Sequence, residues 1–365
     1  MLFQIINKMK TQIFSPGIIL GFLLLINQGI YSQNEVKKEF HEEFPTNLNT
    51  VLSLDNKYGD MDLKNWDKDL VQIDVIVHVE NTSQEKAEKL LGYIDVVFLV
   101  EGDAITAKTV FDEKFSNTST WRDDNDLHID YTVQMPKDIQ LNLYNKYGDV
   151  FINELTGRAT IGIKYGKLKA NRIYRGNEKP LTEIDLGYSD ASIEESDWLK
   201  VTMKYSNLNM NTSSAIILLS KYSKMSLSEC SSLVIEGKYD VYRLGKLSNL
   251  VAAAAYSNFE VEGISEKLSM ETEYSDCKVE YVPATFSSID ITTKYGGYRI
   301  GIDPNASYQI DGQAEYAKIS YPDVGKVNRI VENTSMQVNG IVGRDTNPVS
   351  TVKIVTKYGG IKLDE

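Results

Sequence analysis

Apolar and polar residues alternate in short segments that recur every 17 to 23 residues along most of the chain. Each segment ends in the phrase Lys-Tyr-Gly, Lys-Tyr-Ser or a close variant. With Tyr counted as position zero, positions −4 and −2 are apolar or small, as in Ile161 and Ile163 before Tyr165, and the positions between them are mostly polar. Alternation with a period of two predicts a β-strand with one buried face. This phase predicts that Tyr is the last inward residue of the strand.

The residues after Tyr predict a second, shorter strand. Positions +3 and +5 are apolar again, as in Leu208 and Met210 after Tyr205. Because Tyr and +3 differ by an odd number, the inward face must reset, which predicts a bend at +1 and +2, where +1 is small. A repeat this short is typical of a β-solenoid and too short for helical repeats. We therefore expect an all-β protein, a parallel β-helix or solenoid with coils of about 17–21 residues, and favour right-handed winding.

Stacking the coils would place equivalent residues about 4.8 Å apart, so the tyrosines should form an inward ladder. The spacing of 42 residues between the last two ladder positions is interpreted as two turns of 21. The ladder residues are Tyr58, Tyr147, Tyr165, Tyr188, Tyr205, Tyr222, Tyr239, Tyr256, Tyr274, Tyr295, Tyr316 and Tyr358.

The N-terminal part departs from the repeat. One coil occupies 49–66, and the next ladder tyrosine follows only after an insertion. The insertion holds strand-like runs and a short amphipathic helix near 84–94, with Thr82 and Glu85 as a capping box. The strand-like runs are 71–79, 93–100, 104–111 and 127–134. We expect a small α+β cap over the open end of the solenoid. The predicted organisation is a signal peptide at 1–32, a first coil with capping insertion at 33–140, and the repeat domain at 141–365.

Residues 1–32 predict export. Lys8 and Lys10 precede an apolar stretch at 18–26, and the residues 29–32 then lead into a polar segment, which predicts a cleavage site near Ser32. A membrane anchor is the alternative, but the stretch is short for a span and no later segment is apolar enough. We expect no integral membrane span after cleavage, and a location in the periplasm or on the surface of a Gram-negative-type cell.

The composition of the chain limits the kinds of molecule that it is expected to bind. The net charge of −12 disfavours nucleic acid as a partner, because an acidic protein repels a phosphate backbone.

The two cysteines, Cys230 and Cys277, lie three coils apart, on the order of 14 Å at the spacing of strands. That separation is too large for a disulfide, so both are expected to be small buried hydrophobic residues.

The Asn-Lys-Tyr-Gly-Asp phrases at 56–60 and 145–149, the insertion between them and the Lys-Tyr-Gly/Ser coils that follow resemble a known family. This is the "putative adhesin" family of exported bacterial β-solenoid proteins, related to auto-transporter adhesin head domains. The resemblance spans about 35–365. It implies a parallel β-solenoid and an adhesive or cell-envelope role, and it carries over no catalytic residues.

Parallel β-helices also include carbohydrate enzymes, which need clustered carboxylates. Outward carboxylates recur at −3 (Asp55, Asp185, Glu236, Glu271) and at +2 (Asp60, Asp149, Asp190, Asp276). We interpret both rows as a solvated face of mixed charge. His128 and Asp130 share a strand face but lack a third metal ligand. The acidic stretch 123–126 is expected to be an exposed loop, without the Gly and distal Glu of a calcium loop. No catalytic, cofactor-binding or metal-binding residue is predicted.

Lysine recurs at position −1 and should point outward. Lys164, Lys204, Lys221 and Lys238 form the candidate surface-binding row. One interpretation is a track for an anionic glycan, and the other is a solubilising stripe that discourages sheet aggregation.

These observations predict a non-enzymatic exported β-solenoid that acts as an adhesin or in cell-envelope interactions, with no cofactor. Its partner would be an extracellular glycan or protein. The alternative is a periplasmic structural or sensory partner of an envelope-stress system, bound to an envelope protein. A carbohydrate-active β-helix enzyme is the third hypothesis, disfavoured because all three histidines, His41, His78 and His128, precede the repeat domain.

Overall fold

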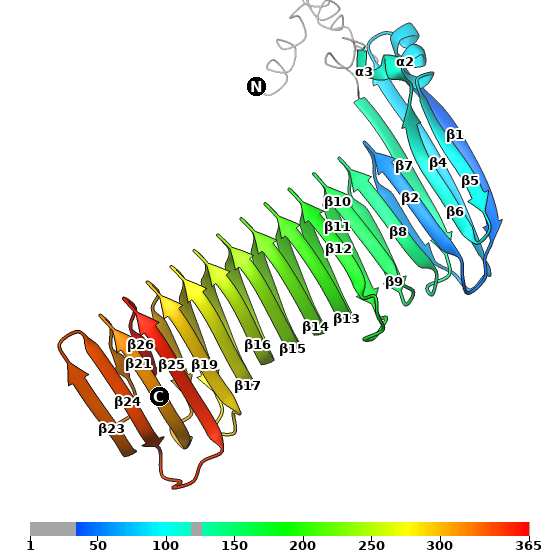
Figure 1. Ribbon diagram of the computed structural model, residues 1–365. Coiled ribbons are helices and arrows are strands. Elements are labelled where there is room, and N and C mark those ends of the chain that lie inside the picture. Colours follow the sequence, from blue (N-terminus) through cyan, green and yellow to red (C-terminus); the bar gives the residue numbers. More distant parts are fainter. Residues whose placement is uncertain (1–33, 118–125, 365) are drawn as a thin grey trace, which may run out of the picture.

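The computed structural model describes residues 34–117 and 126–364, and it is a long stack of parallel strands (Figure 1). The predicted class, a mostly β protein with parallel, sequentially stacked coils, is confirmed. The predicted signal peptide lies outside the described residues. The favoured right-handed winding stays a prediction.

The central coils stack in register. For example, Val201, Leu218 and Ile235 are paired partners on three successive strands. The strands of this region are β8 (Gln140–Lys146), β9 (Val150–Leu155), β10 (Ala159–Lys164), β11 (Lys167–Ile173), β12 (Thr182–Gly187), β13 (Asp190–Lys204), β14 (Asn207–Lys221), β15 (Lys224–Lys238), β16 (Val241–Ala255), β17 (Asn258–Glu273), β18 (Asp276–Val282), β19 (Ser288–Lys294) and β20 (Tyr298–Ile302).

The core lies between the two strand layers of each coil. Residues at −4 and −2, such as Ile161 and Ile163, are fully buried, and so are residues at +3 and +5, such as Leu208 and Met210. The predicted inward positions on both sides of the tyrosine are therefore confirmed.

The tyrosines themselves do not point inward, so that part of the prediction is wrong. Every ladder tyrosine has a positive φ, between 49° and 69°. Apart from Tyr58, which is partly buried, their side chains are 39–54% exposed. The reason is that the inward face resets at the tyrosine itself. A left-handed residue breaks the alternation, so its ring projects outward and position +1 points into the core.

A left-handed conformation costs a residue other than glycine roughly 1–2 kcal/mol, and the corner is built to offset that cost. The Tyr205 amide donates to the carbonyl of Lys221 in the next coil. At +1, the buried Ser206 hydroxyl donates to the Lys204 carbonyl at 2.9 Å, and the Ser206 amide donates to Ser223 Oγ at 3.2 Å. Serines at +1 in several coils thus form an internal ladder behind the exposed rings.

Coils with glycine at +1 use a second type of corner. In all of these coils except the one with Gly166, the residue at −2 is polar and can bond to a nearby carbonyl, as where Asn145 Nδ2 donates to the Gly59 carbonyl at 3.0 Å. A Cβ on Gly148 would lie 1.9 Å from that same oxygen, so the close approach of these coils requires glycine.

The N-terminal end forms the predicted cap of strands and a helix. The antiparallel strands β1 (Asn34–Pro45) and β4 (Leu70–Asn81) continue into β7 (Asp126–Met135). β5 (Ile94–Glu101) pairs with β6 (Ala104–Phe111), which adjoins β2 (Val51–Lys57) in parallel, while β7 adjoins β3 (Met61–Asn65). The helices are α2 (Gln84–Leu91) and α3 (Glu113–Asn117). The predicted strands and the predicted helix are confirmed, and α3 is a second short helix that was not predicted.

The capping box predicted for the helix is wrong. The N-cap residue of α2 is Ser83, and its side chain makes no capping hydrogen bond. Instead, the Ser83 amide donates to Asn81 Oδ1 at 2.7 Å, so an Asn two residues earlier organises the turn into the helix.

The C-terminal coils do not stack in sequence order. The elements are β21 (Tyr308–Glu315), β22 (Ile319–Ser320), β23 (Gly325–Glu332), β24 (Ser335–Val342), β25 (Ser350–Lys357) and β26 (Ile361–Asp364). β25 pairs with both β19 and β21, and β26 with both β20 and β22, so the last coil is inserted between two earlier ones. The interpretation of the 42-residue spacing as two successive turns is wrong, because β23 and β24 form an antiparallel hairpin in that interval.

Candidate functional site

The tyrosines form a continuous stack along one outer corner of the solenoid. Neighbouring rings are stacked with centroids 4.7–5.3 Å apart from Tyr58 to Tyr295, then through Tyr358 to Tyr316. The ladder runs for roughly 50 Å at the spacing of strands. It is an exposed aromatic surface rather than part of the core.

The lysines at −1 are exposed beside this stack. Nζ of Lys204, Lys221 and Lys238 lies 5.2–5.6 Å from the ring centroid of the following tyrosine, within the range of cation–π contacts. Lys164 lines a separate hollow together with Lys146 and Lys204. The structure thus brings three of the four predicted row residues into the same contact, and their role in binding stays a prediction.

Sequence reasoning missed a polar groove of about 770 Å³ that crosses the coils from β13 to β18. Outward residues at repeat positions +4 and +6 line it in every one of these coils. They are Ser192, Glu194, Asn209, Asn211, Ser226, Ser228, Arg243, Gly245, Glu260, Glu262, Lys278 and Glu280. The signal is present in the sequence, because these two rows are polar or glycine in successive coils, but only the rows at −3, −1 and +2 were considered.

The groove changes character along its length. Its β13–β15 part offers short neutral side chains at +4, namely Ser192, Asn209 and Ser226. Its β16–β18 part is charged, and four of its five charged residues, all but Glu262, form two ion pairs. Arg243 Nε lies 3.5 Å from Glu260 Oε2, and on β18 the Lys278 ammonium lies 2.5 Å from the Glu280 carboxylate. The groove therefore combines hydroxyl and amide groups with both signs of charge.

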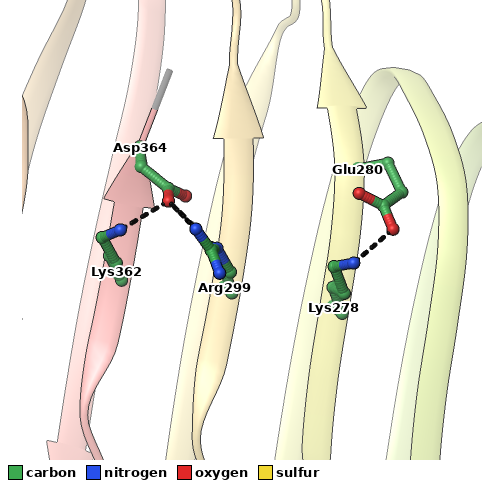
Figure 2. Close-up of polar contacts among 5 residues, drawn as sticks. All are labelled: Lys278, Glu280, Arg299, Lys362 and Asp364. Atoms are coloured by element: carbon green, nitrogen blue, oxygen red, sulfur yellow. Dashed lines mark hydrogen bonds and ion pairs between the residues drawn. The ribbon is translucent and has the colours of Figure 1, made fainter.

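The charged rows continue past the groove into the C-terminal coil. Figure 2 shows Arg299 of β20 and Lys362 of β26 converging on Asp364. The Arg299 Nη2 and Nε atoms lie 2.8 and 3.0 Å from Asp364 Oδ2, and Lys362 Nζ lies 2.7 Å from it. Burial raises the pKa of the Asp364 carboxyl, but the two cations outweigh burial and hold that pKa below its ordinary value.

The carboxylates at +2 have a structural role. Asp60 Oδ1 accepts a hydrogen bond from the Asp149 amide at 2.7 Å, and Asp149 Oδ1 accepts one from the Lys167 amide at 2.8 Å. Asp276 Oδ1 accepts from the Gly297 amide in the same way. These three carboxylates thus satisfy the backbone of the next coil, and the fourth, Asp190, accepts from the Asn207 side-chain amide of the next coil at 2.7 Å. Both contacts favour the structural interpretation of this row over a glycosidase pair.

The cysteines are buried and free, as predicted. Burial raises the pKa of the Cys230 thiol to about 11 and that of Cys277 to about 12. Neither thiol is therefore activated as a nucleophile at neutral pH.

His128 and Asp130 share one face of β7, as expected, but they contact different partners. His128 Nε2 lies 3.0 Å from Asp126 Oδ1, whereas Asp130 Oδ1 accepts the Asp60 amide at 2.8 Å. Of the acidic loop, residues 123–125 lie outside the described residues, and Asp126 begins β7.

No family model matches the sequence, and no curated protein matches it. Among solved structures, the chain is similar to a putative adhesin from Parabacteroides merdae, with 8% identity, coverage of 90% of this chain and 97% of that chain, and a TM-score of 0.33. A putative adhesin from Parabacteroides distasonis gives 8% identity, coverage of 89% and 97%, and a TM-score of 0.34. For a putative cell adhesion protein from Clostridium sporogenes, the identity is 12%, the coverage is 90% of this chain and 99% of that chain, and the TM-score is 0.23.

The resemblance stated from the sequence is confirmed to the extent that these structural neighbours are named putative adhesins or cell adhesion proteins. At such low identities and TM-scores, the similarities carry no argument about what this chain binds. Within residues 34–117 and 126–364, no helix is long and apolar enough to cross a membrane.

Proposed function

We propose that this chain is an exported, non-catalytic solenoid that adheres to an extended polysaccharide, which lies along the groove of β13–β18. The groove is the single observation that carries the proposal. It crosses successive strands, so the same repeat positions face the ligand at steps of about 4.8 Å. A ligand with a repeating chemical structure fits a surface with a repeating spacing.

The lining of the groove supports a polyhydroxylated ligand. Asn209 and Ser226 can each donate and accept hydrogen bonds, as sugar hydroxyls do. Arg243 and Lys278 add donors for carboxylate or sulfate groups of an anionic glycan. The exposed lysines beside the tyrosine ladder would extend this preference for anionic sugars over a second surface.

The carboxylates of the groove support binding rather than hydrolysis. A glycosidase needs one carboxyl kept protonated, usually by an apolar pocket, opposite a second ionised one. Here Glu260 faces Arg243 and Glu280 faces Lys278. The other two carboxylates, Glu194 and Glu262, line the same open polar groove rather than an apolar pocket.

Binding to a panel of neutral and anionic bacterial polysaccharides tests the proposal. The double variant Asn209→Ala/Arg243→Ala should lose at least about tenfold in affinity, because it removes an amide and a charged donor from the groove. The matched control is Thr292→Ala, an exposed polar residue of β19 that lines neither the groove nor the hollow beside the lysines.

Three outcomes separate the hypotheses. Binding that the double variant loses and the control keeps supports the proposal. Binding that the double variant keeps contradicts the groove as its site. Failure to bind any polysaccharide, together with capture of one defined envelope protein, contradicts adhesion to glycans and favours the periplasmic alternative.

A further inference from the structure

Metal-ligating side chains gather on the outer face of the N-terminal cap, away from the groove and the ladder. Cross-strand pairing places Glu35 of β1 opposite Glu80 of β4, and His78 of β4 opposite His128 of β7. Glu80 and His78 are two residues apart on one strand and therefore share a face. Two strands, β1 and β4, thus bring two carboxylates and an imidazole together, and His128 of β7 lies beside them.

The imidazole is the centre of this cluster. His78 Nε2 lies 2.9 Å from Glu35 Oε1 and 3.2 Å from Glu80 Oε1. The ligand atoms of the three residues all lie within 4.8 Å of one another. Four ligands arranged tetrahedrally around Zn²⁺ at about 2.0–2.2 Å are separated by roughly 3.3 Å, so the observed spacing suits such an ion.

The nitrogen is also without a hydrogen bond. His78 Nε2 is buried from solvent and makes no hydrogen bond, although both carboxylate oxygens are close to it. The two oxygens therefore lie off the axis along which this nitrogen would donate. In a metal site, the ion occupies that axis and the other ligands flank it. A buried polar atom that makes no hydrogen bond is costly, and coordination of a metal ion would satisfy this nitrogen.

We propose that Glu35, His78 and Glu80 bind a divalent transition-metal ion, represented here by Zn²⁺. One imidazole and two carboxylates are a ligand set that zinc accepts, and the fourth position falls to water. His128 does not supply it in this arrangement, because its Nε2 lies 3.0 Å from Asp126. The ion would tie β1, the first strand of the described chain, to β4.

The Lys37 ammonium group competes with a metal ion for the Glu35 carboxylate. Its Nζ lies 2.5 Å from the same Glu35 oxygen that faces His78. An ammonium group at that position repels a cation and occupies its ligand. Removing the Lys37 charge should therefore tighten metal binding, an effect that a merely structural ion pair would not produce.

The test is titration of the purified protein, prepared without a histidine tag, with Zn²⁺ alone in a background of millimolar Mg²⁺. We expect one Zn²⁺ per chain and a rise in Tm, because a ligand that binds only the folded state stabilises it. His78→Ala and Glu80→Gln should each weaken the Kd by more than about tenfold, and Lys37→Gln should lower it.

The matched control is His41→Ala on the same pair of strands. His41 Nδ1 lies 2.5 Å from Asp74 Oδ1, so removing His41 takes away a histidine without touching the cluster. Zinc binding that survives in this control and fails in Glu80→Gln supports the site, even where His78→Ala folds poorly. Absence of zinc binding by the unmodified protein overturns the proposal, and so does an unchanged Kd in folded Glu80→Gln.

Discussion

At the scale of single residues, the most unusual feature is a buried carboxylate in the serine ladder. Asp240 replaces serine at +1 and is 2% exposed. Its Oδ1 accepts the Ser223 amide at 2.7 Å, and its Oδ2 accepts the Lys238 amide and the Tyr242 hydroxyl at 2.8 and 2.9 Å. Gly237 makes room, because a Cβ there would lie 2.0 Å from that hydroxyl. Burial raises the pKa of Asp240 despite these hydrogen bonds.

The raised pKa predicts a specific effect of pH on stability. The folded state holds the Asp240 proton more tightly than the unfolded state, so the free energy of unfolding should fall as pH rises from the ordinary aspartate value through the raised pKa. Asp240→Asn cannot ionise and should lack this decrease, so the two proteins should converge in stability, or cross, as pH rises. Urea denaturation between pH 4 and 7 measures this.

Ser206→Ala is the control for that experiment. It removes a neutral member of the same ladder, two coils from Asp240, whose hydroxyl donates to the Lys204 carbonyl at 2.9 Å. Its cost of about 1 kcal/mol should be the same across this pH range. Parallel stability curves for the unmodified protein and Asp240→Asn would show that the buried carboxylate does not govern the pH response.

At the scale of the element, the corner explains both the success and the failure of the sequence reasoning. Period-two alternation located the strands and the inward residues on both sides of Tyr222. It could not locate the ring, because alternation assumes extended backbone and this tyrosine has φ 54°. The odd spacing between tyrosine and +3 indicated that the inward face resets, and the reset falls on the tyrosine rather than at +1 and +2.

The exposed ladder predicts how a change at Tyr222 acts. Its ring stacks on Tyr205 and Tyr239 with centroids 4.9 and 4.8 Å away. Tyr222→Ala should lose both stacks and keep the left-handed strain, at a cost of about 1–3 kcal/mol. Tyr222→Gly loses the same contacts but relieves the strain, so it should be more stable than the alanine variant by about 1 kcal/mol.

Denaturation midpoints of the two variants provide the measurement. The charged variant Tyr222→Asp serves as a further comparison, because an inward position would bury its carboxylate at a cost of several kcal/mol. At the exposed position, Tyr222→Asp should lose about as much stability as the alanine variant. An alanine variant more stable than the glycine variant would contradict the strained corner.

At the scale of the whole molecule, sequence reasoning predicted the solenoid and its cap but not the order of its last coils. Successive elements usually neighbour each other, and a spacing of two repeat lengths fits that rule. The position of the last coil is set instead by long-range strand pairing, because β25 pairs with both β19 and β21. The groove could have been predicted from the sequence, because its lining residues occupy fixed positions of the repeat. The cluster around His78 could not, because it depends on pairing between β1 and β4, which no local sequence pattern indicates.

The inserted coil predicts the effect of removing it. A chain ending at residue 349 lacks β25 and β26, so β21 and β22 lose their parallel partners, and the ladder loses Tyr358 between Tyr295 and Tyr316. Coils of a solenoid contact only their neighbours, so the damage should remain local. Hydrogen exchange should accelerate over 303–349 while the strands from β8 to β17 keep their protection.

The double variant Lys362→Ala/Asp364→Ala is the matched control for this truncation. It removes the contacts with Arg299 shown in Figure 2 but leaves the backbone pairing of the inserted coil in place. Exposed ion pairs contribute about 0–1 kcal/mol, so exchange over 303–349 should stay close to that of the unmodified protein. Loss of protection along the whole chain in the truncated protein would mean that the inserted coil holds the entire solenoid together. Unchanged protection over 303–349 would mean that the coils before and after the insertion can close onto each other without it.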